Sequence, residues 1–191
     1  MKKLGAFLFI SLDGYFEGEN RDISWHRQGT EDNEYAVENL EKDNILLFGR
    51  ITYKMMEKYW TSQEAMKSEP EVAKLMTKSE KIVVSRKLKN PEWENAKCLS
   101  GELISGIQDL KNQSGKDIVI LGSNSIMVQL ADAGLMDRFE IMIDPIAIGS
   151  GKRLFHGLNS KLDLELCDAR KFETGVVLLS YKPNQTNTVN S

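Results

Sequence analysis

Short apolar runs alternate with amphipathic stretches along most of this chain. Unbroken apolar runs are typical of strands that are covered on both faces of a sheet. The predicted strands of this kind occupy residues 4–12, 44–48, 81–84, 96–99, 117–121 and 139–143. Between them, apolar positions at helical spacing predict helices that begin near Thr30, Gly49, Pro70, Gly101 and Gly122. Residues 61–70 and 145–157 are predicted to be loops.

Towards the end of the chain, the pattern changes to alternation of apolar and polar residues. Residues 162–166 and 176–181 alternate in this way and predict an antiparallel pair near a sheet edge. The whole pattern predicts an α/β fold of three layers, with a central mixed, mostly parallel sheet, an antiparallel C-terminal hairpin and helices on both faces. The 191 residues fit one domain, which we expect to span 1–183, followed by a polar, frayed tail at 184–191.

Composition narrows the classes of partner. The formal net charge is −3, which implies no broad basic face and argues against a nucleic-acid partner. No stretch approaches the roughly 20 apolar residues of a membrane span. Two cysteines and two histidines, far apart in the sequence, have no metal-site spacing, so no metal is expected. The cysteines are interpreted as buried thiols of a cytoplasmic protein.

Three of the predicted strand ends carry groups suited to anions, and ligands of open α/β sheets bind beyond strand ends. The first is residues 49–52, where glycine lets a ligand come close to the backbone and the new helix presents free N–H groups. Arg50 adds a positive charge there, and Thr52 adds a hydroxyl. In the second, Ser85 and Arg86 could grip the 2′-phosphate of NADPH. In the third, residues 122–125 again open a helix, now with hydroxyl and amide donors.

Each of these segments also has an ordinary structural interpretation. The first could be a plain strand-to-helix turn, the second a solvated basic turn, and the third a helix N-cap sequence. A further glycine-containing stretch, Gly149-Ser150-Gly151, lacks the third glycine of a phosphate loop, and we interpret it as a loop beside the site. Lys152 and Arg153, which follow it, are secondary candidates.

Taken in order, the segments resemble the dihydrofolate-reductase-like superfamily, and most closely its branch related to the C-terminal reductase domain of the riboflavin-biosynthesis protein RibD. The matching segments are residues 10–16, 45–53, 83–84 with Ser85 and Arg86, 118–123, 134–137, 145 with 149–155, and 175–179. The resemblance covers nearly the whole chain except the tail. It departs from dihydrofolate reductases at residues 122–124, where those enzymes carry three glycines.

The resemblance implies an NADPH-dependent reductase that passes hydride to a small heterocyclic substrate, similar to 5-amino-6-(5-phosphoribosylamino)uracil reductase. It also implies a homodimer, and it places the first strand and the Asp13-Gly14 turn beside the nicotinamide. The implied cofactor-binding residues are Gly49, Arg50, Ile51, Thr52, Ser85, Arg86, Gly122, Ser123, Asn124 and Ser125.

The proton that completes the reduction has three candidate sources: Asp32, Asp13 or bound water. Asp32 is the nearest counterpart of the acidic residue with which dihydrofolate reductases bind the pterin ring, although a first-turn helix acid needs no function to explain it. Two other functions therefore stay open. One is a dihydrofolate or pterin reductase, and the other is a non-catalytic NADPH-binding protein with the same fold.

Overall fold

The computed structural model describes residues 1–99, 101–122 and 124–184. These described residues divide into two compact units, one within residues 1–2 and 28–122 and the other within residues 3–27 and 124–184. Each unit combines two separate stretches of the chain, and the single domain over 1–183 stays a prediction. Of the expected tail, the Asn184 N–H donates to the Asp163 carbonyl at 2.9 Å, and residues 185–191 lie outside the described residues.

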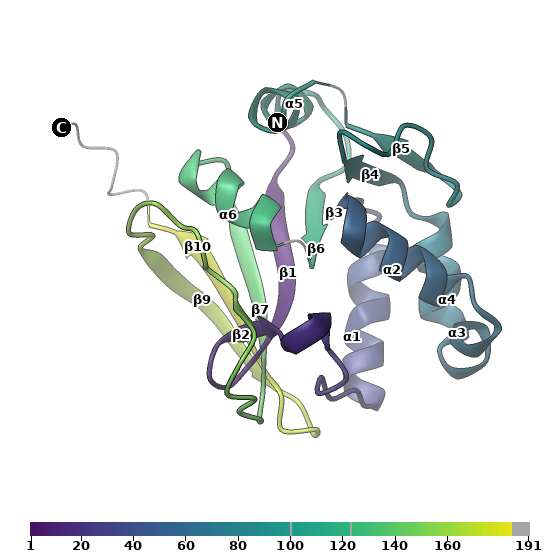
Figure 1. Cartoon of the computed structure of the whole chain (residues 1–191), viewed down its shortest axis with the longest axis vertical. Coiled ribbons are helices and arrows are strands. Elements are labelled where there is room, and N and C mark those ends of the chain that lie inside the picture. Colours follow the sequence, from purple (N-terminus) through teal and green to yellow (C-terminus); the bar gives the residue numbers. More distant parts are fainter. Residues whose placement is uncertain (100, 123, 185–191) are drawn as a thin grey trace. The chain divides into compact units, whose positions relative to one another are not determined.

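The first unit contains four parallel strands in the spatial order β5-β4-β3-β6 (Figure 1). These are β3 (Ile45–Gly49), β4 (Lys81–Val84), β5 (Ala96–Cys98) and β6 (Ile118–Leu121). Its helices are α1 (Thr30–Glu41), α2 (Arg50–Trp60), α3 (Gln63–Ser68), α4 (Pro70–Lys78) and α5 (Leu103–Asn112).

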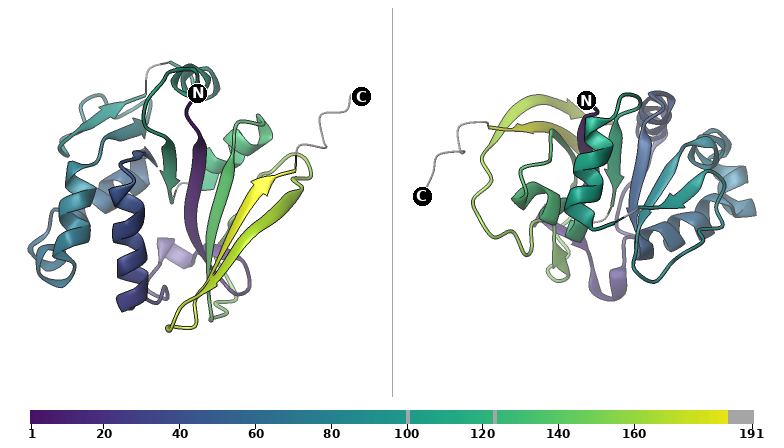
Figure 2. Two further views of the ribbon diagram at one scale, coloured as in Figure 1. Left: turned by 180° about the vertical axis from the view of Figure 1, so that it is seen from behind. Right: turned by 90° about the horizontal axis from the view of Figure 1, so that it is seen from above.

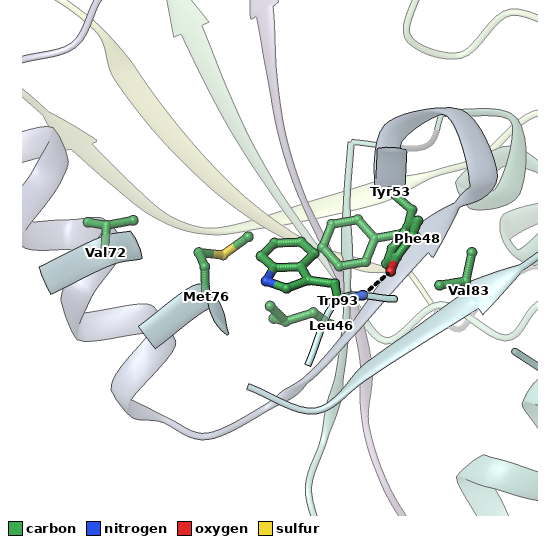
Figure 3. Packing of buried hydrophobic residues seen from close by; sticks show 7 residues of the cluster. All are labelled: Leu46, Phe48, Tyr53, Val72, Met76, Val83 and Trp93. Atoms are coloured by element: carbon green, nitrogen blue, oxygen red, sulfur yellow. Dashed lines mark hydrogen bonds between the residues drawn. The ribbon is translucent and has the colours of Figure 1, made fainter. Parts of the chain in front are cut away.

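An aromatic cluster forms the core between β3 and the helices α2 and α4 (Figure 3). Phe48, Tyr53 and Trp93 pack with ring centroids 6.1–6.4 Å apart. The fully buried Tyr53 hydroxyl accepts a 2.9 Å hydrogen bond from the Trp93 backbone N–H and donates one of 2.8 Å to Glu57. All of residues 45–48 are buried, and successive strand residues point to opposite faces, so β3 is covered on both sides as its apolar run predicts.

The second unit contains four strands in the order β1-β7-β10-β9. Parallel pairing joins β1 (Leu4–Ser11) to β7 (Arg138–Asp144), and antiparallel pairing joins β7 to β10 (Val177–Pro183) and β10 to β9 (Leu164–Lys171). Figure 2 shows β9 and β10 as a long ribbon beside β7. The unit also holds the small pair β2 (Tyr15–Glu17) and β8 (Lys152–Arg153), the 3-10 turn η1 (Glu19–Arg21) and α6 (Asn124–Asp132).

These elements confirm the predicted fold class: α/β, with mostly parallel strands and an antiparallel C-terminal hairpin at an edge. The prediction of a loop over residues 61–70 was wrong, because α3 lies there. The Ser62 hydroxyl caps this helix by accepting from the Ala65 N–H at 3.2 Å, and the Ala65 side chain is fully buried. Strand β9 also runs to Lys171, beyond the predicted 166, since a largely exposed edge strand needs no apolar alternation.

Candidate functional site

One edge of the first unit gathers the three turns that the sequence analysis selected. Strands β4, β3 and β6 are parallel neighbours, with Gly49 paired to Val84 and Leu47 paired to Ile120. Their carboxyl ends therefore meet at the same edge of the sheet. We call this edge, with the three turns that begin there at Gly49, Ser85 and Gly122, the turn edge. This is the edge at which open α/β sheets bind ligands.

The β3–α2 turn leaves the helix N-terminus accessible. Gly49 is the N-cap, with extended backbone at φ −75° and ψ 153°. Within the part of the chain that the structure describes, no side chain caps α2 and no acid lies in its first turn. The first backbone N–H groups therefore have no helical acceptor, and the exposed Arg50 and Ile51 flank them. Such an end attracts an anion through both its N–H groups and the helix dipole.

Thr52 connects two of the turns. Its hydroxyl donates a 2.8 Å hydrogen bond to the Gly122 carbonyl oxygen, so the β3–α2 turn and the end of β6 are directly joined. Because this bond uses the hydroxyl proton, Thr52 in this conformation can accept a hydrogen bond but cannot donate one to a phosphate. Its observed contact positions the turn edge.

The turn after β4 is held by hydrogen bonds within the turn, and the exposed Arg86 side chain extends from it. The Ser85 hydroxyl oxygen accepts from the N–H groups of Lys87 at 3.0 Å and Leu88 at 2.8 Å, which leaves its proton available for donation. The Arg86 guanidinium approaches the Glu102 carboxylate at 3.3 Å, with the two side chains 90% and 80% exposed. Exposed pairs of this kind contribute little to stability, so Arg86 can readily exchange Glu102 for another anion.

The third turn depends on glycine. Gly122 has φ +67°, in the left-handed region that L side chains rarely adopt. Ser123 lies outside the described residues. Asn124 is almost fully buried, and its amide donates weakly to the carbonyls of Arg153 and Leu154, at 3.4 and 3.5 Å. That amide is therefore directed into the second unit's own loop, whereas Ser125 is exposed on the first turn of α6.

Asp13, in the second unit, accepts hydrogen bonds from three donors. Its carboxylate receives the Ser11 hydroxyl at 2.6 Å and the N–H groups of Ile148 and Gly149 at 3.2 and 2.8 Å. The Ser11 hydroxyl, with these backbone groups, holds the pKa of Asp13 below its ordinary value. An acid stabilised in its ionised form is a poor proton donor, so these contacts support an anchoring role for Asp13 on the 148–149 loop.

Asp32 has a different environment, in the first unit. It lies in the first turn of α1 and is only 6% exposed. Helix α1 begins at Thr30, as the sequence predicts, and Gly29 is its N-cap. Few ionisable residues are buried to this degree, and buried acids are common among functional groups.

A histidine and an aspartate form a close pair at the carboxyl ends of β1 and β7 in the second unit. His26 Nδ1 lies 2.8 Å from Asp144 Oδ2, and Asp144 Oδ1 accepts the Arg27 backbone N–H at 2.7 Å. The Asp144 side chain is fully buried and that of His26 is 12% exposed. The imidazole stacks on Phe9, with centroids 4.1 Å apart and planes 6° apart.

Comparison with known proteins identifies the family of this chain. Residues 2–178 match the RibD C-terminal domain family. The chain belongs to the RibD C-terminal domain family. Two relatives come from Bacillus subtilis (strain 168). The uncharacterized protein YyaP is 29% identical, and the match covers 93% of this chain and 93% of YyaP. The uncharacterized protein YwjB is 26% identical, and the match covers 93% of this chain and 96% of YwjB.

Solved structures show the same fold in other members. A putative riboflavin biosynthesis protein from Shewanella sp. PV-4 matches with TM-score 0.74 and 19% identity, covering 96% of this chain and 99% of that one. The diaminohydroxyphosphoribosylaminopyrimidine deaminase/5-amino-6-(5-phosphoribosylamino)uracil reductase of Thermotoga maritima matches with TM-score 0.69 and 14% identity, covering 96% of this chain and 57% of that one. These likenesses confirm the fold that the resemblance implied.

For this RibD C-terminal domain protein, the sequence analysis missed the pair of His26 and Asp144. It treated the histidines as isolated because 118 positions separate His26 from its partner. The one local sign was an aspartate that ends an apolar strand. Among the described residues, no group of three or more histidines, cysteines or acids could hold a metal ion. No described helix is long and apolar enough to cross a membrane.

Proposed function

We propose that this chain is an NADPH-dependent reductase that transfers hydride to a small heterocyclic substrate of the 5-amino-6-(5-phosphoribosylamino)uracil type. The observation that carries the proposal is the alignment of the three turns along one edge of the first unit. A helix N-terminus, an exposed arginine and a glycine turn together suit a ligand with several phosphates. Membership of a family that includes reductases supports the same function.

Each turn has a distinct part in this proposal. The pyrophosphate would be held by backbone N–H groups from two segments. One is the N-terminus of α2 at Gly49, Arg50, Ile51 and Thr52, and the other is the Gly122–Ser125 segment. Ser85 and Arg86 would bind the 2′-phosphate and so favour NADPH over NADH, because the planar guanidinium matches phosphate oxygens. When bound, NADPH supplies the hydride, and the protein orients the nicotinamide against the acceptor carbon.

Replacing Arg86 tests the cofactor assignment. In Arg86→Gln, we expect NADPH affinity to fall about ten- to a hundredfold, since a charge-assisted hydrogen bond contributes about 1.5–3 kcal/mol. NADH affinity should barely change, because NADH has no 2′-phosphate. Titration with each dinucleotide, followed by fluorescence, measures both.

Lys58→Gln is the matched control, since Lys58 is an exposed cation in the last turn of α2, at the opposite end from the proposed phosphate contacts. Equal losses for both dinucleotides, or none for either, would remove Arg86 from this role. Tight NADPH binding without oxidation on any pteridine or aminouracil would instead favour the non-catalytic binding protein.

A dihydrofolate or pterin reductase is the second candidate, and the buried carboxyl of Asp32 in the first turn of α1 is the observation that favours it. In that case Asp32 would bind the pterin ring and assist its protonation. Wild-type activity on dihydrofolate that collapses in Asp32→Asn would support this candidate. Inactivity of the wild-type protein on dihydrofolate would dismiss it.

We further propose a homodimer located in the cytoplasm. Both cysteines are free thiols, Cys98 half-buried and Cys167 exposed, which suits a reducing compartment. The exposure of Cys167 differs from the buried thiol that the sequence analysis expected. Size-exclusion chromatography with light scattering measures the mass, and a monomer of 21.6 kDa would contradict the dimer.

A further inference from the structure

We infer that the second unit contains a binding pocket for a small molecule that joins an oxyanion to a planar, apolar ring. In this pocket Arg153 binds the oxyanion, which is a carboxylate or a phosphate. The inference goes beyond the proposed function and does not depend on it, because every residue that lines the pocket belongs to the second unit.

The pocket has a volume of about 360 Å³ and lies at the carboxyl end of β1. Two segments form it: the end of β1 with the turn that follows, and β8 with the residues after it. The lining residues are Ile10, Gly14, Arg153, Leu154, Phe155 and His156. Small-molecule sites of this size are mostly apolar and carry a few polar groups. Ile10, Leu154 and Phe155 supply the apolar surface against which a ring can pack.

Hydrogen bonds hold the two segments together. The Leu154 N–H donates to the Gly14 carbonyl at 3.3 Å, and β2 pairs with β8 through Tyr15 and Arg153. The Tyr15 hydroxyl donates to the Gly149 carbonyl at 3.2 Å. These contacts order the pocket before a ligand binds, which reduces the entropic cost of binding.

Arg153 is an exposed cation that stacks on an aromatic ring. Its guanidinium carbon lies 4.8 Å from the centroid of the Tyr15 ring. Its N–H groups make two long contacts, of 3.4 Å to the Asp13 carbonyl oxygen and 3.5 Å to the Tyr15 hydroxyl oxygen. The planar set of guanidinium donors matches two oxygens of a carboxylate or phosphate. A ligand oxyanion can therefore replace these long contacts with shorter, charge-assisted hydrogen bonds.

The neighbouring acidic residue does not neutralise this cation. The Asp13 carboxylate accepts hydrogen bonds from Ser11, Ile148 and Gly149, and only the backbone carbonyl of Asp13 contacts Arg153. Within the described ranges of the chain, Arg153 forms no ion pair. Its charge is therefore free to attract an anion into the pocket.

Chemical-shift mapping tests the pocket with probes that separate its two parts. The isotope-labelled full chain is titrated with phenyl phosphate and benzoate, and then with inorganic phosphate and phenol, which carry only the anion or only the ring. We expect both aromatic anions to shift the backbone N–H signals of residues 10, 14–15 and 153–156. Each should bind at least about tenfold more tightly than inorganic phosphate or phenol, because ring burial and the ion pair act together. The tighter of the two identifies the oxyanion.

Replacing Arg153 tests its role in binding the anion. In Arg153→Gln, we expect the affinity for the aromatic anions to fall about tenfold or more, since charge-assisted hydrogen bonds are lost. Arg153→Lys, which keeps the charge without the planar donors, should have an intermediate affinity. Lys152→Gln is the matched control, because Lys152 is the neighbouring cation on β8 and does not line the pocket. Its affinities should equal those of wild type.

Three results would overturn the inference. The first is that neither aromatic anion shifts the pocket signals, or that both shift only residues 49–53 and 85–88 of the turn edge. The second is equal affinity for phenyl phosphate and inorganic phosphate, which would show that no ring is bound. The third is a folded Arg153→Gln variant that binds both aromatic anions as tightly as wild type. The proposed function is tested separately, by the Arg86 variant and NADPH.

Discussion

At the residue scale, several polar side chains of the predicted site hydrogen-bond to this chain's own backbone. Thr52 donates to the Gly122 carbonyl, Ser85 accepts from two N–H groups, and Asn124 donates to the 153–154 carbonyls. The residue types alone indicate donors and acceptors, but not where their bonds go. The groups that remain available to bind phosphates are chiefly backbone N–H groups and the side chains of Arg50 and Arg86. Substitutions of these arginines therefore test phosphate binding more directly than substitutions of the polar side chains.

Asp13 provides a test by pH. Its pKa is lowered in the folded protein, so its contribution to stability is present above its unfolded pKa, near 4, and is lost as pH falls through the folded value. We expect Asp13→Asn to be less stable than wild type at pH 7 and the difference to shrink below pH 4. Urea unfolding at several pH values measures this.

Asp168→Asn, at an exposed aspartate on β9, is the control and should show no comparable difference at pH 7. A stability deficit of Asp13→Asn that stays constant from pH 7 to pH 3 would show that the carboxylate charge is not what anchors the 148–149 loop.

Tyr53 provides a test of the core. In Tyr53→Phe, the buried Trp93 N–H loses its acceptor, and we expect a loss of about 1–3 kcal/mol in the free energy of unfolding. Tyr59→Phe, which removes a part-buried hydroxyl that donates to Glu69 at 2.9 Å, should lose less. Urea denaturation gives both values, and equal losses would argue against the Trp93 bond as the cause.

At the element scale, the apolar runs predicted the strands well because parallel strands covered on both faces must be apolar throughout. The rule that ligands bind beyond strand ends then selected turns that do share one edge. The sequence could not reveal α3, whose six residues show too little periodicity. It also missed the pair β2–β8 and the contact of His26 with Asp144, since such long-range pairings leave no local pattern.

The link between turns gives an element-scale prediction. In Thr52→Val, the hydrogen bond to Gly122 is lost while the side-chain volume is nearly kept. We expect NADPH affinity to fall about two- to tenfold, because a neutral hydrogen bond that positions two turns contributes about 0.5–1.5 kcal/mol. Fluorescence titration measures the change.

The control for that variant is Thr61→Val, since the Thr61 hydroxyl donates to the Glu57 carbonyl at the far end of α2. Affinity for NADPH should be unaffected there. If Thr52→Val bound NADPH as well as wild type, the positions of the β3–α2 turn and Gly122 would not limit cofactor binding.

At the scale of the whole molecule, membership of the RibD C-terminal domain family and the α/β fold are established. The cofactor and the reaction are proposals that depend on the turn edge. Fold alone does not determine the substrate, because one fold hosts many reactions. Asp32, the buried acid of the first unit, is tested by the Asp32→Asn variant described above.

Amide hydrogen exchange with and without NADPH tests the central claim most directly, because it reports both binding and its location. We expect slower exchange on adding NADPH, concentrated at the backbone N–H groups of residues 49–53, 85–88 and 122–126. Unchanged exchange in all three turns, with the dinucleotide in excess, would contradict the proposal that they jointly bind NADPH.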